Sequence, residues 1–188
     1  YRDAHNDIAG TAFDADRHAA LWRGLIEAAL EDWNNAQTDL DRAGPVLHLY
    51  PDEWQARARL ASAEAALGRG HLEIADAQLA RLPDNMPAPL AVDSQLERAR
   101  LYAAEGRKEA GALFAAVENS GNEREAARAV YYRVNADLAS GTTTAQAAIA
   151  ELEKLRFRWR GDALEMKTLR KLSALYCSRK QWRDGVRN

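Results

Sequence analysis

This sequence has one cysteine, no apolar run of membrane-spanning length and no large excess of one charge. Its single cysteine, Cys177, cannot form an internal disulfide, and one thiol cannot supply a thiolate-rich zinc or iron–sulfur site. No apolar stretch approaches the ~18 residues of a membrane-spanning helix, so we expect a soluble protein. The 26 Lys and Arg residues are balanced by 28 Asp and Glu residues, and this balance disfavours a domain that binds nucleic acid.

Motifs of catalysis and of cofactor binding are also missing. No pair of histidines has a metal-binding spacing; they stand alone at His5, His18, His48 and His71. The glycines of Gly68-Arg69-Gly70 lack the Lys-Ser/Thr pair of a phosphate-binding loop, and no Gly-x-Ser-x-Gly nucleophile motif occurs. We therefore expect no enzyme, no metal and no cofactor.

Helix-forming residues are abundant, whereas β-branched residues are few and do not alternate as they do in strands. Glycine and proline break this helical pattern at short intervals. The sequence predicts an all-α protein with helices near 15–30, 33–43, 52–67, 71–82, 90–104, 107–118, 122–139, 143–156, 162–178 and 181–188. Capping side chains are expected at Asp52, at Asp93 or Ser94, and in the run Thr142–Thr144.

These helices pair into a repeat. The residues that open the second helix of each pair recur about 37 residues apart, at Trp33, Leu72, Lys108, Ala145 and Trp182. Small residues stand three positions after these anchors, at Ala36, Ala75, Gly111, Ala148 and Gly185, and nine positions before them, at Gly24, Ala63, Ala99, Ala136 and Ser173. Two antiparallel helices approach closely where both carry a small residue, so the pattern predicts stacked helical hairpins. In the third hairpin, Ala110 and Phe114 suggest a slip of one residue.

The third hairpin carries the clearest turn, Leu101-Tyr102-Ala103-Ala104-Glu105-Gly106-Arg107-Lys108-Glu109-Ala110-Gly111-Ala112-Leu113-Phe114, and Tyr176 precedes its anchor by the same distance as Tyr102. This pattern resembles a degenerate tetratricopeptide repeat. The resemblance implies a right-handed α-solenoid of about five antiparallel hairpins in a single domain over 1–188, with repeats near 15–44, 52–83, 90–119, 122–156 and 162–188. The unfinished last hairpin leads us to expect a fragment of a longer chain.

The resemblance also implies a function, because the first helix of each hairpin lines a concave groove that receives a partner segment in this family. Positions twelve and eight before the anchors then face this groove. All of them except Ala174, together with two neighbouring lysines, are the candidate binding residues: Leu21, Leu25, Leu60, Glu64, Leu96, Arg100, Arg133, Asp137, Lys167, Arg170 and Lys171. The groove is expected to be apolar at its N-terminal end and basic at its C-terminal end. The Lys/Asn carboxylate clamp of chaperone-binding members is not reproduced, so an acidic or amphipathic protein segment is the expected partner.

Two further features have competing interpretations. The stretch Arg156-Phe157-Arg158-Trp159-Arg160 could stack on single-stranded nucleic acid, but we expect Phe157 and Trp159 to pack between repeats instead. Trp22 and Trp54 are likewise expected in the core or between repeats. Besides a non-catalytic interaction scaffold, a passive segment of a longer solenoid and a helical enzyme or small-ligand regulatory domain remain as alternatives.

Overall fold

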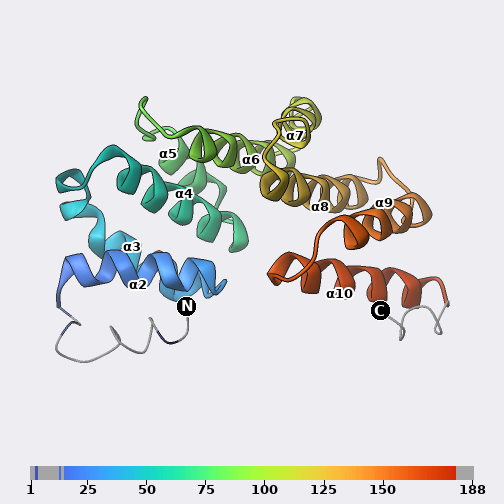
Figure 1. Cartoon of the computed structure of the whole chain (residues 1–188), viewed down its shortest axis with the longest axis horizontal. Coiled ribbons are helices and arrows are strands. Elements are labelled where there is room, and N and C mark those ends of the chain that lie inside the picture. Colours follow the sequence, from blue (N-terminus) through green and yellow to red (C-terminus); the bar gives the residue numbers. More distant parts are fainter. Residues whose placement is uncertain (1–2, 4–12, 14, 181–188) are drawn as a thin grey trace. The chain divides into compact units, whose positions relative to one another are not determined.

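The structure is a computed structural model that describes residues 3, 13 and 15–180. Within that part of the chain there are nine α-helices and no β-strand, which confirms the predicted all-α class. The helices are α2 (Arg17–Ala29), α3 (Trp33–Ala43), α4 (Asp52–Gly68), α5 (Leu72–Leu79), α6 (Ala88–Ala104), α7 (Ala110–Glu118), α8 (Glu123–Ser140), α9 (Ala145–Arg158) and α10 (Ala163–Ser178), with a 3₁₀ helix η2 (Gly44–Leu49) after α3 (Figure 1).

The predicted helix ends lie within about three residues of those observed, and the helix predicted at 181–188, together with Gly185 and Trp182, lies outside the described residues. Side-chain caps explain several starts. Asp16, Asp32, Asn122, Thr144 and Asp162 each accept a hydrogen bond from a free amide of the first turn.

Two of the predicted caps are wrong. Pro51 precedes α4, so Asp52 is already its first helical residue. Helix α6 begins at Ala88, which places Asp93 and Ser94 inside it, and the Ser94 hydroxyl donates to the Ala91 carbonyl over 2.7 Å. Proline fits a helix start because its fixed φ and missing N–H suit the first turn. At α4 and α6 the helix therefore begins next to a proline and not after the predicted capping residue.

The chain forms two compact units, Tyr1–Leu101 and Tyr102–Asn188. In the first unit α2 packs on α3, α3 on α4 and α4 on α5, and α2 also contacts α4. Small residues make the close contacts: Ala28, Ala36 and Ala65 form one buried cluster, and Ala63 and Ala75 are both fully buried. The predicted small positions of the first two hairpins therefore lie in the interior.

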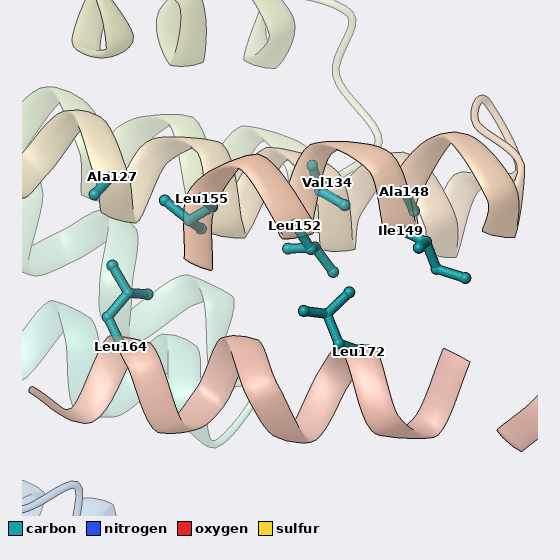
Figure 2. Packing of buried hydrophobic residues seen from close by; sticks show 8 residues of the cluster. All are labelled: Ala127, Val134, Ala148, Ile149, Leu152, Leu155, Leu164 and Leu172. Carbon is teal, nitrogen blue, oxygen red and sulfur yellow. The ribbon is translucent and has the colours of Figure 1, made fainter. Parts of the chain in front are cut away.

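In the second unit α7 packs on α8, α8 on α9 and α9 on α10. Its core contains Val134 of α8, Ile149, Leu152 and Leu155 of α9, and Leu164 and Leu172 of α10. Figure 2 shows Leu164 and Leu172 pointing from α10 toward the leucines of α9. The burial of these side chains on three successive helices makes them one continuous core.

Helix α7 departs from the register predicted for it. Gly111 is exposed, and a Cβ atom built there meets nothing within 4 Å. Ala110 and Phe114 are buried instead, at 7% and 2% exposure. The predicted small buried position is thus Ala110 and not Gly111, which agrees with the one-residue slip expected from Ala110 and Phe114.

Candidate interaction surface

Four aromatic rings gather on one surface of the first unit. His18 and Trp22 lie four residues apart on α2 and so share one helix face, Tyr50 follows η2, and Trp54 lies in the first turn of α4. We call His18, Trp22, Tyr50 and Trp54, with Arg57 beside them, the aromatic face. Helices α2 and α4 bring these residues together because they pack directly on each other.

The rings of the aromatic face contact one another in defined geometry. The Trp22 and Trp54 centroids lie 4.8 Å apart at 73°, and those of Trp22 and Tyr50 lie 6.3 Å apart at 78°; both are edge-to-face contacts. The His18 Nδ1 lies 2.8 Å from the Tyr50 hydroxyl. The Arg57 guanidinium carbon is 5.3 Å from the Trp54 centroid, within the range of a cation–π contact. These contacts join His18, Tyr50, Trp22, Trp54 and Arg57 in one continuous series.

The aromatic face is open to solvent. Trp22 keeps 38% of its surface exposed, His18 is exposed, and Tyr50 and Trp54 are half-buried. The sequence predicts Trp22 either in the core or between repeats; the side chain lies outside the core and contacts Trp54 of α4. The buried stripe of α2 runs through Ala20, Leu21, Gly24 and Ala28, and Trp22 stands to one side of it.

The predicted groove residues at the N-terminal end lie elsewhere. Leu21, Leu60 and Leu96 are at most 3% exposed, so these three side chains offer no surface to a partner. Leu25 is half-buried against the cluster that contains Leu21. In the first unit, position twelve before the anchor thus faces the interior, where leucine is stabilised by burial.

Charged residues at the next predicted positions bind each other. The Arg100 Nη1 donates to Oε2 of the buried Glu97 over 2.6 Å and lies 3.4 Å from Oε1 of Glu64. The contact with Glu64 joins α6 to α4. Glu64 and Arg100 are therefore brought together, in a contact between two helices.

Arg133 lies at the centre of a network of carboxylates. Its Nε donates to Glu118 of α7 over 2.6 Å, and its terminal nitrogens lie 3.5 Å from Asp137 and 3.6 Å from Glu151 of α9. Burial lowers the pKa of Arg133, but the hydrogen bond to Glu118 and the charges of the three carboxylates outweigh burial and raise its pKa overall. Three carboxylates already neutralise this guanidinium. Arg133 therefore does not add a free positive charge to the basic end that is expected for the groove.

The three remaining candidates lie on α10. The Lys167 ammonium is 5.9 Å from the Tyr132 ring centroid, Lys171 is half-buried, and Arg170 is exposed. Arg133 instead points to α7 and α9 through its ion pairs. Of the basic residues predicted to bind a partner, Arg170 is exposed and the others are half-buried.

The two aromatic residues of the stretch Arg156–Arg160 lie in different surroundings. Trp159 packs against the core of the second unit and its Nε1 donates to Asp162 over 2.9 Å, as the packing interpretation expected. Phe157 is 69% exposed, so the same expectation is wrong for this ring. The guanidinium carbons of Arg156 and Arg160 lie 5.6 and 5.9 Å from its centroid.

Within residues 3, 13 and 15–180, no three His, Cys, Asp or Glu side chains are grouped so that they could hold a metal ion. None of the helices described there is long and apolar enough to cross a membrane. Comparison of the chain with protein-family models, with curated proteins and with solved structures gives no match.

Proposed function

We propose that this chain is a stack of tetratricopeptide-like hairpins and a non-catalytic scaffold that binds a protein segment through the aromatic face. The order of helix contacts supports the first part of the proposal. Helix α3 packs on both α2 and α4, helix α9 packs on both α8 and α10, and α2 contacts α4 directly. In this arrangement α2 and α4 are the first helices of the first two hairpins, which line the groove of such a stack.

The observation that carries the binding proposal is the exposed edge of Trp22, held against Trp54 and Tyr50. Rigid aromatic rings supply large contact areas at low entropic cost, and tryptophan and tyrosine are enriched where interfaces gain most of their binding energy. Tyr50 also packs against the core cluster that contains Leu21 and Leu40, whereas Trp22 keeps 38% of its surface open to solvent. The placement of the aromatic face on the first helices favours an external partner.

The chemistry of the aromatic face indicates the partner. The rings accept an apolar anchor such as a leucine or proline side chain, while Arg57 and His18 stand at the rim. Arg57 pairs with Glu53 over 2.7 Å, and both side chains are more than 40% exposed, so an acidic group of a partner can compete for the guanidinium. An amphipathic segment with an apolar anchor next to a carboxylate fits this surface.

Site-specific photo-crosslinking tests the proposal. A benzoylphenylalanine at position 22 of the full chain should capture a discrete protein from native lysate, with the crosslinked peptide of that protein carrying an apolar residue beside Asp or Glu. The matched control places the same group at position 157, where an exposed ring lies in the other unit. Equal capture at both positions, or none at position 22, contradicts the proposal.

A second measurement separates binding from folding. Trp22→Ala should weaken the identified complex at least about tenfold, as expected for an interface hot spot, while the helical circular dichroism of the chain stays unchanged. Phe157→Ala should leave the affinity unchanged. Charge reversal at Arg170 is the appropriate test of a basic groove, because reversal at Arg133 also disrupts its ion pairs to Glu118 and Glu151.

A further inference from the structure

A cavity of about 290 Å³ opens inside the first unit, among α2, α3, η2, α4 and the end of α5. Part of its wall is apolar, from Leu21, Leu40, Leu47 and Ala58. The rest is polar and comes from Asp41, Arg59, Ser62, Gln78 and Arg81. This volume suits a small molecule or the end of a larger one.

Two arginines border the cavity without an acidic partner in the described residues. The Arg59 Nη1 donates to the Gln78 Oε1 over 3.4 Å, and its Nε is buried with no hydrogen-bond acceptor. Burial, and then the positive charge of Arg81, lower the pKa of Arg59. Two guanidiniums that repel each other beside a cavity are stabilised by a shared anion.

The neutral side chains at the cavity also have hydrogens to donate. The Ser62 hydroxyl accepts from the Gln37 Nε2 over 3.3 Å, which leaves its own hydrogen for another acceptor. The Gln78 Oε1 accepts from Arg59, so the Gln78 amide NH₂ remains a donor. Asp41 is the one carboxylate on the wall, and its Oδ1 already accepts from Gln37 over 2.8 Å. Donors therefore exceed acceptors at this site.

We infer that this cavity binds a small organic oxyanion, whose phosphate or carboxylate group lies between Arg59 and Arg81 and whose apolar body contacts Leu21 and Leu47. The two guanidiniums and the Ser62 and Gln78 donors match the several oxygens of such a group. The apolar wall accepts the carbon skeleton. This site is separate from the aromatic face, since Arg59 borders the cavity whereas Arg57, two residues earlier, contacts Trp54.

Calorimetric titration of the full chain tests this inference with three probes of matched shape: phenyl phosphate, benzoate and benzyl alcohol. The two anions should bind and the neutral alcohol should not. Tighter binding of phenyl phosphate assigns the site to a phosphate ester, and tighter binding of benzoate assigns it to a carboxylate. A chain that binds neither anion at millimolar concentration, or binds the alcohol equally well, overturns the inference.

Matched charge-removing variants localise the binding. Arg81→Gln should weaken the preferred anion at least about tenfold, the size expected for loss of one charge-assisted hydrogen bond. Arg69→Gln removes the same charge from an exposed position just after α4 and should leave the affinity within twofold, about the resolution of the comparison. Equal weakening by both variants would show a diffuse electrostatic effect and overturn the site. Because Arg81 is exposed, its variant should fold like the wild type, and an unchanged melting temperature without anion checks this.

Discussion

Gly24 on α2 lies directly against Leu40 on α3. A Cβ atom at position 24 would stand 2.7 Å from the Leu40 Cγ and 3.0 Å from its backbone nitrogen, closer than real Cβ atoms approach such neighbours. The crossing of the first hairpin thus depends on a residue without a side chain. The same contact explains the need for a small residue at position 24.

Gly24→Ala should therefore destabilise the chain by about 1–3 kcal/mol, because the added methyl must displace Leu40 or its backbone. Gly111→Ala is the matched control. It makes the same change within α7, where the new methyl meets open space, and should stabilise the chain by about 0.4–1 kcal/mol. Urea unfolding of the two variants measures both effects. Equal free energies of unfolding for the two variants would contradict the close crossing.

Sequence features close to each helix predicted where the helices begin and end, but not always which side chains are buried. Glycine and proline breaks and helix-forming composition gave helix ends close to those of α2 to α10. A helix turns by about 100° per residue, so a one-residue error in register moves a predicted groove residue into the core. Leu21, Leu60 and Leu96 are buried, whereas Trp22, one position from Leu21, is on the surface.

Contacts between distant residues had no local signal in the sequence. The carboxylates around Arg133 come from α7, α8 and α9, and the cavity beside Arg59 takes Arg81 from beyond α5. In the sequence, these charged residues cannot be told apart from those of ordinary solvated helix faces. The i, i+4 spacing of His18 and Trp22, off the buried stripe of α2, was the one available sign of the aromatic face.

The buried ion pair between Arg23 and Asp39 provides a second prediction. The Arg23 Nε donates to the Asp39 Oδ2 over 2.8 Å, and both side chains are nearly inaccessible. Arg23→Met should cost about 3 kcal/mol, near the lower end for breaking a buried pair because Arg42 still contacts Asp39 over 3.2 Å. Urea unfolding should show this loss.

The double variant Arg23→Met/Asp39→Leu should recover much of that stability, since no buried charge is left unpaired. Arg57→Met removes an arginine from an exposed pair with Glu53 and should change the free energy of unfolding by less than about 0.5 kcal/mol. Additive losses in the double variant would mean that the two buried charges do not stabilise each other.

Three consecutive threonines, Thr142–Thr144, precede α9, and only one of them caps the helix. The Thr144 Oγ1 accepts from the Ala147 amide over 3.2 Å, which makes Thr144 the N-cap of the helix. Thr144→Ala should lower the free energy of unfolding by about 1 kcal/mol. Thr143→Ala, one residue earlier and outside the cap, should lower it by less than about 0.5 kcal/mol. Thr144→Ser keeps the acceptor and should restore most of the loss, whereas equal losses from all three variants would exclude a capping role.

The network around Arg133 makes a prediction that depends on pH. The hydrogen bond from Lys154 lowers the pKa of Glu151, burial opposes it, and the charges of Lys154 and Arg133 add to the lowering, so the pKa lies below its ordinary value. A carboxyl group with a lowered pKa stabilises the folded state above its ordinary pKa, and that stabilisation is lost as the pH falls through the lowered value. The guanidinium of Arg133 stays charged throughout.

Arg133→Met should therefore destabilise the chain most at neutral pH, where Glu118, Asp137 and Glu151 are left facing one another without the guanidinium. We expect a loss of about 1–2 kcal/mol at pH 7, and less than half of it below about pH 4, where the carboxylates of the variant take up protons. Lys154→Met is the control, because Lys154 is 75% exposed and should contribute less than about 0.5 kcal/mol at pH 7. Urea unfolding at both pH values measures the difference. A loss from Arg133→Met that is the same at both pH values would show that the side chain acts through packing of its methylene groups and not through its charge.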